Sequence, residues 1–438
     1  MTTAQQPNAA RPVVQLTEYA TCVLPGVRLG DARAVERAAA LREKINIRET
    51  STGLEITATQ WVGRVDVGPV RVVVRPKLPQ APLTCLLRYA YRLRDLDIRE
   101  ETQTPTGQGG FHDLLATMLA METAALIQQG LAKRHIERAE KLASPRGRIA
   151  IGEIARQGGV IEARLPCRYF DRRVDWRLNQ IVRAGLDATA ARCEDRDLRH
   201  RLHRLASAFP AADPRVPATK ASLAQAQSEL TRLTAPYDPV LALLGLLQDM
   251  HGVELELPDG QVRVEGYLFD MNMFFQRLVS RFLHDHLQTH RIEDETAVRR
   301  IFAYAPGGNP RGRNTPQVRP DYALFQGKTL RAYLDAKYRD VWSEGNRNSW
   351  LYQLAIYALA SPTQTSVMLY ASMSGEASDE TIELRHPIAG SNDRATIILR
   401  PVPLVHLAGL LSPGNKHRAL TERRQTAEAL ISLDRRSR

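Results

Sequence analysis

The feature that most constrains the fold is a pair of short apolar segments in the last third of the chain, joined by Gln326-Gly327-Lys328. Both segments are rich in aromatic and aliphatic side chains, and the triplet between them contains the glycine that tight turns favour. This pattern predicts a β-hairpin. Because side chains alternate along a strand, Asp335 and Lys337 then share one face, and Ala336 points into the core.

The register of this hairpin predicts a cluster of charged groups. A turn at the triplet brings Asp321 roughly opposite Asp335 on the neighbouring strand, with the ammonium of Lys337 beside them. Two adjacent carboxylates are costly unless a cation or a proton neutralises them. Oxygen ligands of this kind suit Mg²⁺, or alternatively Mn²⁺. We therefore predict a metal site held by Asp321 and Asp335.

Such a cluster is suited to phosphodiester hydrolysis. A metal there would polarise the scissile phosphate, and Lys337 would orient the attacking water or stabilise the charge that grows on the phosphate. Gln353 and Tyr357 lie four residues apart on a predicted helix, so they share a face that would look toward the metal site and the DNA backbone. The alternative is a surface hairpin whose aspartate and lysine form an ordinary ion pair.

The chain has 438 residues, which is long for one compact core, so two or three domains are expected. The pattern predicts a mixed α/β protein with four regions: a β-rich module with helices at 12–150, a helical connecting region at 151–260, an α/β domain at 261–405, and a basic tail at 406–438. We expect the tail to be a solvated end rather than a basic helix. We also expect the first region to be separable from a folded α/β domain.

The expected elements follow from periodicity and propensity. Helices are predicted at 33–45, 83–93, 111–131, 172–192, 220–233, 239–250, 269–287 and 349–359. Strands are predicted at 54–57, 70–75, 299–304, 322–325, 330–336, 365–370 and 396–399, with Gly63–Pro69 as a connection between the first two.

Composition narrows the class of protein. The chain carries 60 Lys and Arg against 48 Asp and Glu, a net charge of +12 that favours an anionic partner such as nucleic acid. The four cysteines are scattered, which argues against a disulfide framework or a thiolate metal site. No apolar segment is long enough to span a membrane and no apolar signal core follows Met1, so we expect a cytoplasmic protein without a membrane partner.

Other candidate motifs give weaker evidence of a function. His284, His286 and His290 have zinc-like spacing but no third ligand, and a solvent-facing polar stripe is the better interpretation. The Gly-rich segment 307–312 lacks the lysine of a phosphate-binding loop, so nucleotide hydrolysis would have to come from a partner. We interpret it as a loop that would touch DNA through Arg311 and Arg313.

Asp321, Asp335-Ala336-Lys337 and Gln353-x-x-x-Tyr357 together resemble the PD-(D/E)xK nuclease superfamily in its RecB-like arrangement. Further segments, in the same order along the chain, resemble the McrC family. These are Gly63–Gly68 with Val72–Leu78, Arg146-Gly147-Arg148-Ile149, Asp175 with Asn179, and Asp270–Phe275. The family usually has a glutamate where this chain has Gln276, so Gln276 is a possible auxiliary residue that brings no charge.

The resemblance implies an Mg²⁺-dependent endonuclease subunit of a restriction system directed at modified DNA, such as 5-methylcytosine DNA. It also implies a hexameric AAA+ GTPase partner, which the subunit stimulates through its amino-terminal region, and pairing of two nuclease domains for double-strand cleavage is possible. Arg64, Arg71, Arg75 and Lys77 belong either to the partner-facing surface or to the polar face of a small sheet. Two alternatives stay open: a non-catalytic DNA-binding adaptor that activates an AAA+ partner, and a RecB-like repair exonuclease.

Overall fold

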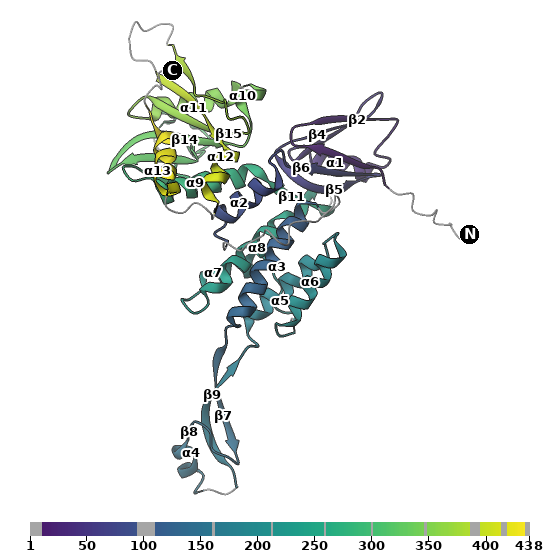
Figure 1. Cartoon of the computed structure of the whole chain (residues 1–438), viewed down its shortest axis with the longest axis vertical. Coiled ribbons are helices and arrows are strands. Elements are labelled where there is room, and N and C mark those ends of the chain that lie inside the picture. Colours follow the sequence, from purple (N-terminus) through teal and green to yellow (C-terminus); the bar gives the residue numbers. More distant parts are fainter. Residues whose placement is uncertain are drawn as a thin grey trace, which may run out of the picture. The chain divides into compact units, whose positions relative to one another are not determined.

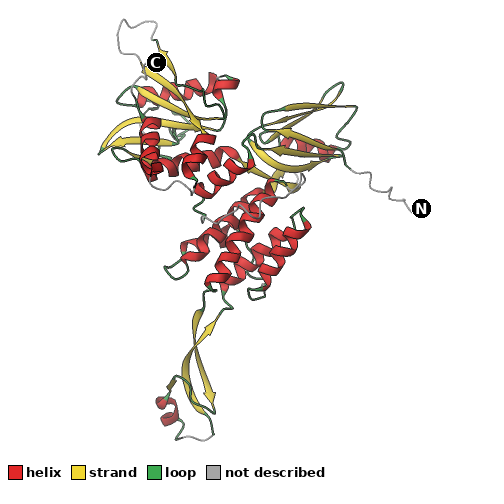
Figure 2. Cartoon of the chain, viewed as in Figure 1, coloured by secondary structure: helices red, strands yellow, loops and turns green. Residues whose placement is uncertain are grey.

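The structure is a computed structural model of the chain. It describes residues 11–93, 110–159, 163–211, 213–257, 260–298, 301–345, 348–385, 395–412 and 418–433. The protein is mixed α/β, as expected, and has two compact units (Figures 1 and 2). The first comprises residues 1–95, 255–264 and 268–438, and the second comprises residues 96–254 and 265–267.

The amino-terminal part of the first unit contains two sheets. A five-stranded sheet has the order β1-β6-β5-β11-β10, and a three-stranded sheet has the order β2-β4-β3, with α1 (Ala32–Ala40) beside it. The strands of these sheets are β1 (Val13–Thr17), β2 (Thr21–Pro25), β3 (Ile45–Glu49), β4 (Gly53–Ala58), β5 (Trp61–Val67), β6 (Val70–Arg75), β10 (His251–Leu257) and β11 (Gly260–Asp270). Alternate residues of β4 and β6 are buried, which is why these segments were recognisable as strands.

Two expectations for this region are wrong. Gly63–Pro69 is not a connection, because Gly63–Val67 belongs to β5 and only Gly68-Pro69 forms the turn. Gly68 has a φ of +55°, and a Cβ there would lie 2.7 Å from the carbonyl oxygen of Leu29, so this turn requires glycine. The expected boundary at 260/261 also fails, because β10 and β11 join the sheet of the amino-terminal strands.

The carboxyl-terminal part of the first unit is built on a six-stranded sheet of order β12-β13-β14-β15-β17-β16. Its strands are β12 (Arg291–Asp294), β13 (Tyr322–Gln326), β14 (Thr329–Lys337), β15 (Thr365–Ser372), β16 (Glu380–Leu384) and β17 (Ala395–Pro403). The central strands β14, β15 and β17 are parallel, and the outer ones are antiparallel. Every residue of β15 is buried, as a central parallel strand requires.

Helices cover both faces of this sheet. On one face, α11 (Asn348–Ala360) contacts β14, β15 and β17, and α10 (Val341–Glu344) contacts β15. On the other face, α9 (Met271–His286) contacts β12 and β14, while α2 (Gln80–Ala90) and α13 (Arg418–Ile431) contact α9, and α12 (Leu404–Leu411) contacts β17. The core between sheet and α11 includes Ala323, Tyr333, Leu354, Tyr357 and Met368.

Two further expectations for this region are overturned. The carboxyl-terminal segment is not a solvated end: α13 buries Ala427, Leu430 and Ile431. No strand occurs at Ile301–Tyr304, and residues 299–300 of that expected strand lie outside the described residues.

The second unit is a helical body with an extended hairpin (Figure 2). Its body contains α3 (Phe111–Gln129), α5 (Arg177–Ala190), α6 (Arg196–Ser207), α7 (Lys220–Ser228), the 3-10 turn η1 (Ala235–Tyr237) and α8 (Asp238–Met250). Helix α3 packs with α6 and α8 of this body. The sequence analysis instead placed it with the amino-terminal strands, in the region 12–150. The helix expected at 172–192 begins only at Arg177.

The hairpin was missed from the sequence. Strands β7 (Arg134–Leu142) and β9 (Leu165–Arg173) pair antiparallel along their whole length, with β8 (Arg148–Ile149) on the edge and α4 (Ile151–Arg156) beside it. At its base, the Asn179 side chain donates to the carbonyl oxygens of Ala132 and Val174 and accepts from the Tyr237 hydroxyl. These bonds satisfy a buried amide and fix the hairpin to the helical body.

Candidate active site

The β13–β14 hairpin has the predicted register. Tyr322 pairs with Leu334, and Gln326 pairs with Thr329, so the turn is Gly327-Lys328 with a φ of +59° at the glycine. Asp321 directly precedes β13 and therefore lies opposite Asp335. The backbone N–H of Ala336 donates to Oδ2 of Asp321 at 2.7 Å, which ties the first carboxylate to the strand that carries the second.

Asp335 and Lys337 extend from the same face of β14. Nζ of Lys337 lies 2.8 Å from Oδ2 of Asp335, and the two side chains are 20% and 2% exposed. The carboxylate is therefore buried, while the lysine side chain keeps part of its surface exposed. A lysine held in this way can contact a charged group that approaches from outside without leaving its aspartate.

Both carboxyl groups have a raised affinity for protons. Burial, followed by the charge of Asp335, raises the pKa of Asp321 to about 6. Burial also raises the pKa of Asp335, although the Lys337 ammonium opposes this. One lysine cannot balance two carboxylates, so ionisation of both leaves a net negative charge in a buried place. A divalent cation would relieve that charge, and carboxylate oxygens are the donors that Mg²⁺ prefers.

Helix α9 supports both strands through one polar face. Nε2 of Gln276 donates to Oδ1 of Asp321 at 3.0 Å, and Oδ1 of Asn272 accepts the backbone N–H of Tyr338 at 2.9 Å. These residues are four apart and share a side of the helix. Because Gln276 donates its amide nitrogen to Asp321, it stabilises the ionised carboxylate. Asn272 lies in the segment Asp270–Phe275 that resembles the McrC family, but the sequence alone does not indicate its bond to Tyr338.

Gln353 and Tyr357 extend from α11 toward the same carboxylates, but the tyrosine is not free to face DNA as expected. Nε2 of Gln353 donates to the Tyr357 hydroxyl at 2.7 Å and lies 3.5 Å from Oδ1 of Asp335. Tyr357 is fully buried, and its hydroxyl donates to the carbonyl oxygen of Arg319 at 3.0 Å. It therefore holds the backbone that leads into Asp321, and only Gln353 reaches a carboxylate.

Arg311 and Arg313 lie in the loop before β13, and both side chains are exposed. The loop is closed by Asn309, whose side chain accepts the N–H of Arg313 and donates to its carbonyl oxygen. Among the described residues, no hydrogen bond joins either arginine to Asp321 or Asp335. Their contact with DNA remains a prediction.

The family model described as McrBC 5-methylcytosine restriction system component matches residues 56–371. This match spans more than half of the chain. The chain belongs to the McrBC family. The resemblance to the McrC family is thereby confirmed, and the amino-terminal signature beginning at Gly63 lies within the matched residues.

Solved structures related to this McrBC family member come from Thermococcus gammatolerans. One, a half-complex from a tetradecameric assembly of McrB AAA+ hexamers with bound McrC, has a TM-score of 0.62 at 17% identity and covers 96% of this chain and 100% of that chain. Another, the McrBC complex, has a TM-score of 0.45 at 18% identity and covers 62% and 87%. No curated protein matches the sequence. The first similarity shows that the fold is shared.

Arg146-Gly147-Arg148-Ile149, one of the segments that carried the family resemblance, has a structural explanation. Gly147 has a φ of +70°, and a Cβ there would lie 2.4 Å from the carbonyl oxygen of Arg168 on β9. The Arg146 guanidinium lies over the Tyr169 ring, 4.8 Å from its centroid. The segment therefore shapes the end of the β7–β9 hairpin.

The histidines on and after α9 are not a solvent-facing stripe throughout. His284 is exposed and lies beside Asp294, but His286 is buried and stacks on the Tyr89 ring. Burial lowers the pKa of His286, which favours the neutral ring. His290 instead pairs with Glu428 of α13.

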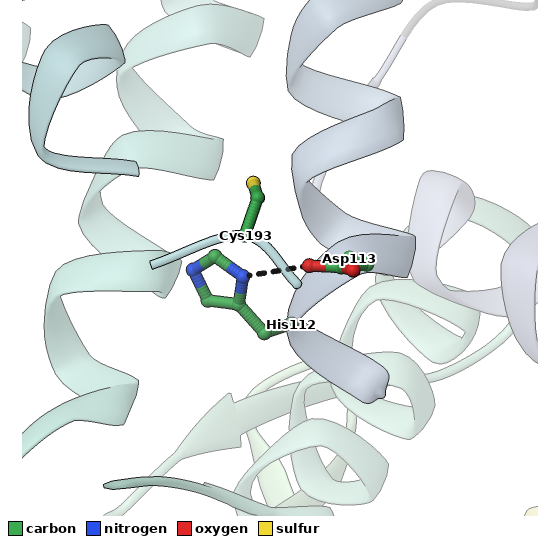
Figure 3. Close-up of side chains that lie close together, drawn as sticks. All are labelled: His112, Asp113 and Cys193. Atoms are coloured by element: carbon green, nitrogen blue, oxygen red, sulfur yellow. Dashed lines mark hydrogen bonds and ion pairs between the residues drawn. The ribbon is translucent and has the colours of Figure 1, made fainter. Parts of the chain in front are cut away.

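A second cluster of ligand-type side chains lies in the second unit (Figure 3). His112, Asp113 and Cys193 are all buried, and their ligand atoms lie within 4.8 Å of one another. The Asp113 carboxylate accepts the backbone N–H groups of Glu194 and Asp195 at 3.3 and 3.0 Å, just before α6. Burial raises the pKa of the Cys193 thiol, which favours the uncharged form. These contacts explain the cluster as a clamp between the start of α3 and the loop before α6.

Within the part of the chain that the structure describes, no helix combines the length and the apolar character needed to cross a bilayer.

Proposed function

We propose that this chain is the DNA-cleaving subunit of a McrBC-type restriction system and hydrolyses phosphodiester bonds with Mg²⁺, or Mn²⁺, held by Asp321 and Asp335. The observation that carries the proposal is the convergence of the buried Asp335 carboxylate, the partly buried Asp321 carboxylate and the partly buried Lys337 side chain at the end of one hairpin. Family membership supports it, since the family is that of a restriction system component.

Each residue of the site has a task in this proposal. Asp321 and Asp335 hold the metal, and the Ala336 amide and the Gln276 side chain orient Asp321. When bound, the metal supplies Lewis acidity toward the scissile phosphate and the attacking water. Lys337 contacts the phosphate and stabilises the negative charge that grows on it. Gln353 keeps the Asp335 side chain in place.

The proposal includes an AAA+ partner that this subunit stimulates. The support is the shared fold with a structure of McrB AAA+ hexamers with bound McrC, together with the absence of a G-x-x-x-x-G-K-[ST] motif from this sequence. Nucleotide hydrolysis then belongs to the partner, and the partner reads the modified base, with 5-methylcytosine as the expected modification.

One observation favours a second candidate function, a DNA-binding adaptor that activates the partner without cutting. Gln276 brings no charge to Asp321, so the site has one carboxylate fewer than the family pattern implies. The intact set of Asp321, Asp335 and Lys337 argues for the nuclease.

The experiment that separates these functions is cleavage of methylated and unmethylated plasmid by the full chain with its AAA+ partner and Mg²⁺. It is run with GTP, with ATP and without nucleotide. Nucleotide-dependent cutting of the methylated plasmid is expected, and it identifies the fuel. Normal stimulation of nucleotide hydrolysis without any cutting would overturn the nuclease and establish the adaptor.

A further inference from the structure

The strand that carries Asp335 and Lys337 ends at Tyr338, which is held by the amino-terminal part of the first unit. The Tyr338 hydroxyl donates to Oε2 of Glu18 at 3.2 Å. The same carboxylate oxygen accepts the backbone N–H of Lys77 at 2.9 Å. Glu18 is 1% exposed, so these bonds form away from water, where a charged acceptor is strong.

The backbone of Tyr338 is fixed on both sides. Its carbonyl oxygen accepts the Tyr19 hydroxyl at 2.5 Å, and its N–H donates to Asn272 of α9 at 2.9 Å. Every polar group of Tyr338 is therefore bonded, and Glu18 and Tyr19 supply two of the three partners. Because Tyr338 directly follows Lys337, these bonds set the direction in which the lysine leaves the strand.

The conformation of Tyr19 indicates that this contact is built into the fold. Tyr19 has a φ of +60°, a left-handed conformation that a residue with a bulky side chain rarely adopts without support. Its ring is covered by the Lys77 ammonium, 5.3 Å from the ring centroid, and by the Arg339 guanidinium at 5.0 Å. Contacts from both parts of the unit thus hold the turn after β1 against the end of β14.

We infer that Glu18 is a positioning residue for the active site: it holds Tyr338, and through it the end of the strand that presents Lys337, so the amino-terminal strands are an integral part of the nuclease. This inference rests on the proposed function. The contact between Glu18 and Tyr338 differs from ordinary packing between two parts of a protein in its location. Tyr338 is the immediate neighbour of the proposed catalytic lysine.

The test compares single-turnover cleavage by Glu18→Ala, Glu18→Gln and Tyr338→Phe in the full chain with its AAA+ partner, methylated plasmid and Mg²⁺. Glu18→Ala should lower the rate on the order of tenfold with an unchanged KM for DNA, because misplacement of a reacting group slows the chemical step. Glu18→Gln keeps an oxygen that accepts both hydrogen bonds, so it should stay within about threefold of wild type. Tyr338→Phe should resemble Glu18→Ala, and the double variant should be no slower than the worse single one.

Glu49→Ala is the matched control. Glu49 also accepts a backbone N–H in the amino-terminal strands, that of Leu29 at 2.6 Å, but the structure gives it no bond to β14 among the described residues. It should cut at the wild-type rate. Should Glu18→Ala fail to fold, Tyr338→Phe, which removes only a hydroxyl, decides the question.

The outcomes separate this inference from the proposed function. Wild-type rates for Glu18→Ala and Tyr338→Phe, or an equal loss in Glu49→Ala, would overturn the positioning role and leave the nuclease intact. An inactive wild type that still stimulates its partner would overturn the proposed function and the positioning role with it.

Discussion

The backbone N–H of Ala336 donates to the carboxylate of Asp321 across the β13–β14 hairpin, at 2.7 Å. Ala336 lies between Asp335 and Lys337, so the first carboxylate is bonded to the peptide that joins the other two groups of the site. The strand register therefore sets the separation of the three Cα positions.

The first prediction concerns the pH dependence of stability. The pKa of Asp321 is raised from 3.8 to about 6, so its protonated form stabilises the metal-free fold fully below pH 4, and this contribution is lost as pH rises through about 6. Wild type should therefore lose up to about 3 kcal/mol of unfolding free energy relative to Asp321→Asn across that range. Urea denaturation in EDTA at pH 4 and 7.5 measures this difference.

Two controls belong to that measurement. Mg²⁺ should restore the stability of wild type at pH 7.5 but not that of Asp321→Asn. Asp213→Asn changes a partly exposed carboxyl whose pKa Arg215 lowers, so any effect of pH on its contribution to stability should have the opposite sign. Parallel curves for wild type and Asp321→Asn would contradict the coupled pair.

The second prediction concerns Gln276→Glu. The new carboxylate would replace an amide that donates to Asp321 at 3.0 Å, so the metal-free protein should be less stable at neutral pH. With metal, the extra oxygen ligand should lower the Mg²⁺ concentration that gives half-maximal cleavage, by several-fold. Calorimetric Mg²⁺ titration checks this, with Gln276→Leu as the variant that removes the amide without adding charge. Weaker binding by Gln276→Glu than by Gln276→Leu would rule out a supporting role at this position.

The active-site hairpin could be predicted because its signals are local. Two apolar segments, a glycine turn and D-x-K spacing all lie within residues 321–337, and strand geometry converts them into a register. The bonds from Glu18 and Tyr19 to Tyr338 could not be predicted, since they join residues about 320 apart in sequence. The periodicity of a sequence does not indicate contacts between residues so far apart in the chain.

The β7–β9 hairpin and α13 were missed for different physical reasons. Both faces of β7 are largely exposed, so its charged residues show no alternation of polar and apolar side chains. Helix α13 mixes charged side chains with alanines and a few larger apolar residues, and its packing on α9 and α12 reveals the buried positions. Both segments are stabilised by tertiary or cross-strand contacts that composition alone does not show.

The third prediction tests why α13 is ordered. The buried Arg400 guanidinium pairs with Asp379 at 2.7 Å and donates to the carbonyl oxygens of Leu430 and Ser432 at the end of α13. Arg400→Met should lower the free energy of unfolding by about 3–5 kcal/mol, because it leaves a buried carboxylate without its cation. Urea denaturation should show this loss. Arg215→Met removes an ion pair that is 90% exposed on its arginine and should change stability by less than about 1 kcal/mol.

The fourth prediction concerns a chain that starts at residue 151. The sequence suggested that it would keep a folded nuclease domain. The structure favours the opposite outcome, because β11 would lose its neighbour β5, and Tyr338 would lose Glu18 and Tyr19. We expect this truncated chain to lack a cooperative thermal transition, whereas the full chain has one. A truncated protein that melts cooperatively and cleaves DNA would show that the carboxyl-terminal part does not depend on the amino-terminal strands for its fold.

The most direct test of the central claim is plasmid cleavage by Asp335→Asn with the AAA+ partner, Mg²⁺ and the active nucleotide. The variant keeps the size of the side chain but removes the charge that pairs with Lys337 and binds the metal. We predict no detectable cleavage, with nucleotide hydrolysis by the partner stimulated as strongly as by wild type. Cleavage at the wild-type rate would show that the hairpin of Asp321, Asp335 and Lys337 is not the nuclease site.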